Sequence, residues 1–177
     1  MPIDTEAQFT DVYRAHYGDV LRFVRRRADP MTVDDIVGET FLAAWRRRRE
    51  LPDDPRPWLF GTARKLMLNA HRGLRRQSAL VVQIQRAAAA DGHESMADVA
   101  IQVEGRIDLV AAWRSLAPAD QEVLALNVWE QLDARDAAKV LGCTRAAYAM
   151  RLTRAKRRLA GRLNPAAPAS PALSLTH

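Results

Sequence analysis

Hydrophobic side chains recur every three or four residues through most of this chain, which is the spacing of one face of an α-helix. Three such stretches come first, over residues 6–28, 32–49 and 58–77. Two shorter ones follow, around residues 107–116 and from residue 118 to about 128. The pattern therefore predicts an all-α protein.

Local signals indicate where several of these helices begin and end. The Asp29-Pro30 pair ends the first stretch, because proline disfavours helix in the residue before it. Thr32 and Asp35 have a spacing like that of a capping box at the start of the second stretch. Residues 50–57, with three prolines and two aspartates, form a loop that can continue neither flanking helix.

The last periodic stretch, residues 133–163, has the pattern of a helix-turn-helix. Asp133 can cap a short helix, and Gly142 suits the position just past its end, where a positive φ is common. Thr144 can then cap a second helix, which is rich in arginine and contains no acidic residue. This pattern predicts a second helix that enters a DNA major groove. The plain alternative is a basic helix that is only solvated surface.

Charge divides the chain into three parts. The net charge is +6 and the isoelectric point is about 10.2, which favours a polyanionic partner. Residues 1–78 carry +4, residues 79–106 carry −2 and residues 107–163 carry +4. We therefore expect two small helical domains, 6–78 and 107–163, joined by a linker over 79–106. The Pro- and Ala-rich tail, residues 164–177, is expected to be disordered.

Several classes of protein are not favoured. No apolar run approaches the roughly 18 residues that span a bilayer, and the N-terminus lacks a signal-peptide pattern, so we expect a cytoplasmic protein without membrane insertion. A single cysteine, Cys143, excludes an internal disulfide and a CxxC metal site. No cofactor, metal or catalytic residue is expected.

Two further surfaces carry chemistry. Asp34, Asp35 and Glu39 form an acidic patch on the second helix; favourable interaction with the helix N-terminus explains the first two better than Glu39. The third helix is basic and begins with aromatic residues, which suits the phosphates and unstacked bases of melted DNA. Its aromatic residues could equally belong to the core.

Three segments in this order resemble the extracytoplasmic-function (ECF, group IV) sigma factors of bacterial RNA polymerase. VDDIVGETFLAAWRR is similar to their polymerase-binding helix, and RPWLFGTARKLMLNAHRGLRR to their helix for recognising and melting the −10 element. The segment from LAPADQEVLALNVWE to TRAAYAMRLTRAKRRL is similar to their −35-binding domain. The resemblance covers residues 7–78 and 107–163.

The resemblance implies a role for each surface. It implies that core RNA polymerase, through its clamp helices and flap, is one partner, that promoter DNA is another and that an anti-sigma factor is a third. The implied polymerase-binding residues are Asp35, Glu39, Thr40 and Trp45. The implied −10-binding residues are Asp53, Asp54, Arg56, Trp58, Arg64, Lys65, Asn69, Arg72, Arg75 and Arg76. The implied −35-binding residues are Thr144, Arg145, Tyr148, Ala149, Arg151, Leu152, Arg154, Lys156 and Arg158.

The chain departs from the family pattern in the recognition helix. Ala146, Ala147, Ala149 and Met150 stand where glycine, threonine, lysine and serine are usual, and Tyr148 replaces a smaller apolar residue. These changes predict a −35 sequence different from the usual one and a shifted packing of this helix.

Two other functions explain less of the sequence. A stand-alone helix-turn-helix regulator that binds operator DNA as a dimer would explain residues 107–163, but it leaves the acidic patch and the basic third helix unexplained. An enzyme is disfavoured because the histidines, at positions 16, 71, 93 and 177, are scattered and Cys143 has no evident partner.

Overall fold

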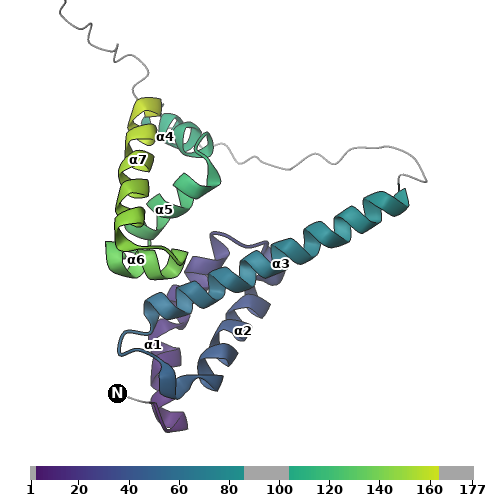
Figure 1. The fold of residues 1–177 in the computed structure, drawn as a ribbon, viewed down its shortest axis with the longest axis vertical. Coiled ribbons are helices and arrows are strands. Elements are labelled where there is room, and N and C mark those ends of the chain that lie inside the picture. Colours follow the sequence, from purple (N-terminus) through teal and green to yellow (C-terminus); the bar gives the residue numbers. More distant parts are fainter. Residues whose placement is uncertain (1–2, 86–103, 164–177) are drawn as a thin grey trace, which may run out of the picture.

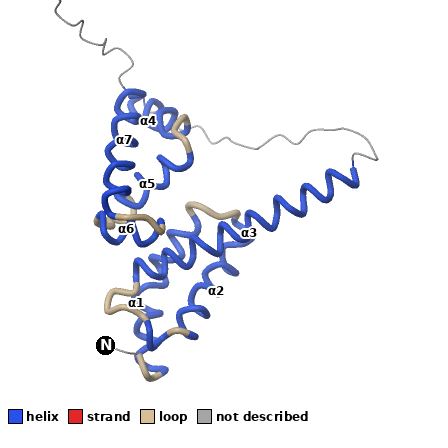
Figure 2. Tube along the Cα trace, viewed as in Figure 1, coloured by secondary structure: helices blue, strands red, loops and turns tan. Residues whose placement is uncertain are grey.

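The computed structural model of this protein describes residues 3–85 and 104–163. Every regular element among these residues is a helix (Figure 2), so the prediction of an all-α protein is confirmed. The helices form two bundles, one from each described segment (Figure 1).

The N-terminal bundle contains three long helices. They are α1 (Glu6–Arg25), α2 (Val33–Arg46) and α3 (Arg56–Gln85), with 3₁₀ turns η1 (Pro30–Thr32) and η2 (Arg48–Glu50) on either side of α2. Thr5 and Gln8 form a reciprocal capping box that fixes the start of α1. The apolar faces predicted from the spacing pack α2 against both α1 and α3.

Thr32 stands at the N-cap position of α2 as predicted, but the capping box expected with Asp35 does not form. Thr32 makes no side-chain capping hydrogen bond; its hydroxyl donates to the carbonyl of Asp29 instead, at 3.0 Å. The Asp29 carboxylate accepts the backbone N–H of Met31 at 2.9 Å and so caps the preceding η1 turn. The chain therefore enters α2 through a 3₁₀ turn, which a capping-box pattern does not anticipate.

The C-terminal bundle contains four helices. They are α4 (Glu104–Arg114), α5 (Pro118–Val128), α6 (Ala134–Leu141) and α7 (Arg145–Leu163). Pro118 occupies the first turn of α5, where the missing N–H costs no hydrogen bond. α7 packs against α4, α5 and α6.

α3 is longer than its hydrophobic pattern predicts. It continues to Gln85, so the first part of the segment expected to be a linker is helical, and residues 104–106 belong to α4. The rest of that segment, residues 86–103, and the expected disordered tail, residues 164–177, lie outside the described residues.

The larger of two apolar clusters is shared by both bundles, and a smaller one, formed by Leu116, Leu124 and Ala155, lies within the C-terminal bundle. α6 lies across α3 (Figure 1), where the α3 backbone at Gly61 comes so near that an added Cβ would be 3.7 Å from Val140 Cα. Phe23 and Phe60, stacked with ring centroids 4.5 Å apart, belong to the same buried cluster as Tyr148 of α7. Such burial is the main favourable term in holding the bundles together.

Candidate nucleic-acid interface

The helix-turn-helix forms as its local signals predict. The Asp133 carboxylate accepts hydrogen bonds from the backbone N–H groups of Arg135 and Asp136, both at 2.8 Å. The hydrogen bond from the Asp136 N–H is the largest cause that lowers the pKa of Asp133 below its usual value; desolvation opposes it, and the hydrogen bond from Arg135 adds to it. Gly142 ends α6 with a φ of 65°, and the Thr144 hydroxyl accepts the N–H of Ala147 at 3.1 Å. Both helix starts and the turn between them are therefore fixed locally.

One side of α7 is part of the core, and this corrects the prediction for Tyr148. The Tyr148 side chain is fully buried, and its hydroxyl donates to the carbonyl of Val123 at 3.2 Å. Burial raises the pKa of this phenol. Leu152 is half-buried and packs on both apolar clusters. Tyr148 therefore anchors α7 to α5, and its side chain cannot reach DNA in this structure.

The other sides of α7 are exposed and strongly basic. Arg158 pairs with Asp120 of α5, with Nη1 2.7 Å from Oδ2, and Arg154 Nε donates to the carbonyl of Met150 at 3.4 Å. The remaining predicted −35 residues all lie on the surface: Thr144, Arg145, Ala149, Arg151 and Lys156. Since α7 contains no acidic residue, its exposed surface matches a phosphate backbone in charge.

The acidic patch lies on α2, in the N-terminal bundle. Asp35 and Glu39 are both exposed, as a contact with another protein requires. Thr40, which was expected to bind polymerase, is fully buried, so that prediction is corrected. Its hydroxyl donates to the carbonyl of Ile36 at 2.6 Å. Trp45 is half-buried between the ring of Phe9 and the guanidinium of Arg48, so only part of it is available to a partner.

The loop before α3 has a structural role that its acidity did not suggest. Asp53 and Asp54 are exposed, and the Asp54 carboxylate accepts the backbone N–H of Arg56 at 3.1 Å, which helps to begin α3. Arg56 is not free for phosphate, because its Nε lies 2.8 Å from Oδ2 of Asp19. Trp58 is half-buried against the core.

The predicted DNA-binding face of α3 is only partly open. Lys65, Asn69 and Arg72 are exposed, and Arg72 donates to the Asn69 side-chain oxygen at 2.8 Å. Arg75 and Arg76 fall in the part of α3 whose side chains are not described.

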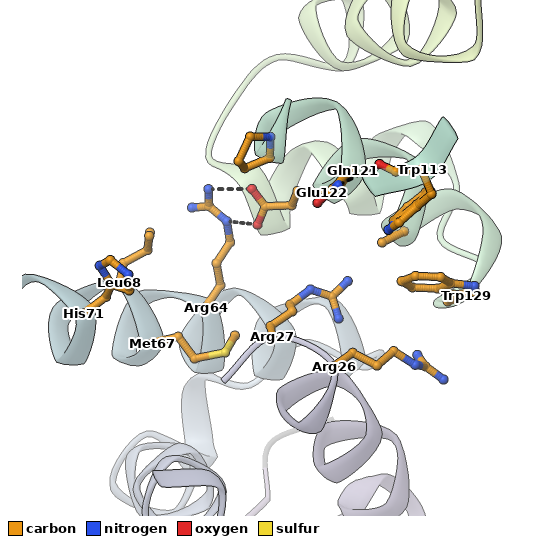
Figure 3. A pocket seen from close by; sticks show the side chains of 12 residues that line it. Arg26, Arg27, Arg64, Met67, Leu68, His71, Trp113, Gln121, Glu122 and Trp129 are labelled. Carbon is orange, nitrogen blue, oxygen red and sulfur yellow. Dashed lines mark hydrogen bonds and ion pairs between the residues drawn. The ribbon is translucent and has the colours of Figure 1, made fainter. Parts of the chain in front are cut away.

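Arg64 is held by the other bundle. Its Nε lies 2.6 Å from Oε1 of Glu122, and its Nη2 donates to Oε2 at 3.1 Å (Figure 3). This bidentate pair raises the pKa of Arg64, mainly through the hydrogen bond itself. In this structure the guanidinium therefore faces α5 and not an open DNA-binding surface.

A second ion cluster between the bundles was not predicted from the sequence. Glu130, only 3% exposed, accepts hydrogen bonds from Nη1 of Arg26 and Nη1 of Arg27, the latter at 2.9 Å. Burial lowers the pKa of Arg27, although Glu130 opposes that shift. The arginines at the end of α1 therefore bind the C-terminal bundle. In the sequence, arginines with this role look the same as arginines that interact only with the helix dipole.

A cleft of about 500 Å³ opens beside these ion pairs (Figure 3). Arg26, Arg27 and Arg64 line one side of it, and Trp113 and Trp129 line the other, with ring centroids 4.9 Å apart. The cleft therefore lies at the junction of the bundles and combines aromatic surface with positive charge.

The described segments contain neither a candidate metal site nor a membrane-spanning helix. No group of three or more His, Cys, Asp or Glu side chains is placed to hold a metal ion. No helix in these segments is long and apolar enough to cross a membrane.

Comparison with known proteins assigns a family to each bundle. A family model for Sigma-70 region 2 matches residues 12–77, and one for Sigma-70, region 4 matches residues 106–159. The protein named RNA polymerase sigma factor NccH, from Alcaligenes xylosoxydans xylosoxydans, is 31% identical over 135 residues, which cover 72% of this chain and 70% of that protein. "Probable RNA polymerase sigma factor RfaY" from Xanthomonas campestris pv. campestris is 34% identical over 133 residues. That match covers 72% of this chain but only 33% of the relative.

Solved structures share the fold. The sigma factor RpoE of Bartonella quintana, in complex with the anti-sigma factor NepR, matches with a TM-score of 0.58 at 19% identity, over 90% of this chain and 98% of that one. CnrH, in complex with the cytosolic domain of CnrY, matches with a TM-score of 0.57 at 25% identity, over 92% of this chain and 91% of that one.

Proposed function

Because the chain belongs to the sigma-70 family of RNA polymerase sigma factors, in its extracytoplasmic-function group, we propose that it directs core RNA polymerase to promoters. The N-terminal bundle binds the polymerase through α2 and opens the −10 element through α3. The C-terminal bundle binds the −35 element through α7.

One observation carries this proposal: a single chain presents an exposed acidic patch and an uninterrupted basic helix on separate bundles. Asp35 and Glu39 on α2 would be repelled by DNA phosphates, so they suit a protein partner with basic residues. The exposed arginines of α7 suit the DNA. A stand-alone operator-binding regulator needs the second surface and leaves the first without a role.

The arrangement of the bundles adds a step to this function. The −10 and −35 elements are about two helical turns apart, roughly 70 Å along the duplex. α6 packs directly against α3, and Arg64 of α3 is paired with Glu122 of α5. We therefore place the bundles together in the free protein and apart on the promoter, with the polymerase holding each at its own element.

Regulation and location follow from the same assignment. CnrH was solved in complex with the cytosolic domain of CnrY, which supports a protein partner for this chain too, and we propose that this partner is an anti-sigma factor. Bacterial core polymerase works in the cytoplasm, so we place the protein there. The role is that of a specificity subunit without catalytic residues or a cofactor of its own.

The test is direct binding to purified core polymerase in the absence of DNA, measured by gel filtration or interferometry. The native chain is expected to form a stable complex. Glu39→Lys is expected to weaken it at least tenfold by placing like charges together. Asp11→Lys makes the same charge change at an exposed position on α1 and is the control. The proposal fails if the native chain does not bind core polymerase, or if both variants bind it as well as the native chain does.

A further inference from the structure

The side of α7 that faces away from the core can be located from the buried residues. Tyr148 and Ala155 are both fully buried. Met150 lies two residues after Tyr148, and Arg157 lies two residues after Ala155. A step of two residues is a rotation of about 200° around the helix. They therefore lie on the side of α7 opposite the core, and both are exposed.

The first two turns of this outward side carry methyl groups and little else. Met150 is 61% exposed, and Ala146 and Ala149 are exposed beside it. Thr153 completes the group, and its hydroxyl donates to the carbonyl of Ala149 at 3.0 Å, so its donor is already used. We call these four residues the methyl patch. It has no side chain free to donate a hydrogen bond to a base edge.

Positive charge surrounds the methyl patch. Arg145 precedes it at the first residue of α7, and Arg154 and Arg157 follow it, all three exposed. No acidic residue occurs anywhere in α7. The expected occupant is therefore a polyanion that presents an apolar group at the centre of the contact.

The DNA major groove meets both requirements. Its edges carry hydrogen-bond donors and acceptors from all four base pairs, but one apolar group, the 5-methyl of thymine. Methionine is unbranched and polarisable, so it adapts well to such a group. The alanines on either side have no long side chain that would keep the helix away from the base edges.

We propose that Met150 determines specificity by contacting the 5-methyl group of a thymine in the −35 element, with Ala146 and Ala149 allowing the close approach. This rests on the proposed function, because it takes α7 as the helix that enters the groove. Arg145, Arg154 and Arg157 bind phosphates or guanines around the contact, and the methyl patch selects A·T pairs at its centre.

The experiment uses holoenzyme, assembled from core polymerase and the full chain, on a promoter whose −35 element has been located from mapped transcripts. Each thymine of that element is replaced in turn by deoxyuridine, which removes the 5-methyl group and keeps base pairing. Replacement of the contacted thymine is expected to weaken promoter binding about fourfold, the size expected for one buried methyl group. In holoenzyme with Met150→Ala, the same replacement is expected to have no effect.

Met31→Ala is the matched control, because Met31 is 88% exposed on η1, in the other bundle. With this variant the loss on deoxyuridine DNA must remain about fourfold. The inference is overturned if no deoxyuridine position weakens binding, if Met150→Ala keeps the native sensitivity or if the element contains no thymine in either strand. Transcription that proceeds normally in these cases leaves the proposed function standing; absence of any promoter-dependent transcript would remove both.

Discussion

Arg64 of α3 and Glu122 of α5 are 58 positions apart in the chain, yet they form a bidentate ion pair across the two bundles. Both side chains are about one-quarter exposed, so water screens the pair only in part. Arg64 lies on the face of α3 that we assign to the −10 element, and in this pair its guanidinium is bound to Glu122. We therefore expect binding of that element and packing of the bundles to compete for the same guanidinium.

Glu122→Gln tests this competition. Removing the charge of Glu122 is expected to release Arg64 and to raise the affinity of the free chain for a −10 fork DNA about three- to fivefold. This corresponds to roughly 1 kcal/mol, the upper range for a partly exposed pair. Fluorescence anisotropy measures the affinity. Asp136→Asn makes the same charge change on α6, where Asp136 pairs with Lys139, and it should leave the affinity nearly unchanged. An equal gain in both variants would show that only net charge matters.

Glu130→Ala is expected to cost much more stability than Glu122→Gln. Glu130 is buried, and its loss leaves Arg27, whose side chain is 14% exposed, without its carboxylate partner. Breaking a buried ion pair from one side typically destabilises a protein by about 3–5 kcal/mol. Urea denaturation of the full chain gives the free energy of unfolding. A loss below about 1 kcal/mol would mean that solvent or another group compensates Arg27.

The cap of α6 predicts a dependence of stability on pH. Backbone hydrogen bonds lower the pKa of Asp133 in the folded protein, so the folded state binds this proton less readily than the unfolded state does. The resulting stabilisation is present above the unfolded pKa, near 3.9, and is lost as the pH falls through the folded pKa. Asp133→Asn keeps a capping oxygen without the charge. It should lower the melting temperature at pH 7, and the difference should shrink below about pH 4. A difference that is constant with pH would exclude the charge as its cause.

Arg151→Ala separates phosphate binding from base reading on α7. Arg151 is exposed beside the methyl patch, and its loss is expected to weaken binding of a −35 duplex by about fivefold or more. An equal loss on a scrambled duplex would identify Arg151 as a phosphate contact, and a loss confined to the specific duplex would identify a base contact. Arg46→Ala, an exposed arginine on α2, is the charge-matched control and should change neither affinity.

The features that the sequence predicts best are those fixed by neighbouring residues. The helix-turn-helix follows from Asp133, Gly142 and Thr144, each of which acts within four residues of its own position. The same signals are less reliable where two turns compete, as at Thr32, where Asp29 caps an intervening 3₁₀ turn.

Contacts between distant segments could not be predicted in this way. Glu130 meets Arg27 across 103 positions, and neither residue differs in pattern from an ordinary exposed charge. Burial of Thr40 and Tyr148 likewise depends on how the helices pack, because a residue beside the apolar stripe can face either the core or a partner. The candidate surfaces on α2 and α7 can therefore be predicted from the sequence. Which of their residues are buried in the core or held in ion pairs cannot.

The most direct test of the central claim is transcription in vitro by purified core polymerase on a pool of genomic promoter fragments, with and without this protein. The account predicts new transcripts with discrete start sites that depend on the protein, with two shared elements upstream of them. Tight DNA binding by the protein alone, without any new transcript, would contradict the account and favour a stand-alone helix-turn-helix regulator.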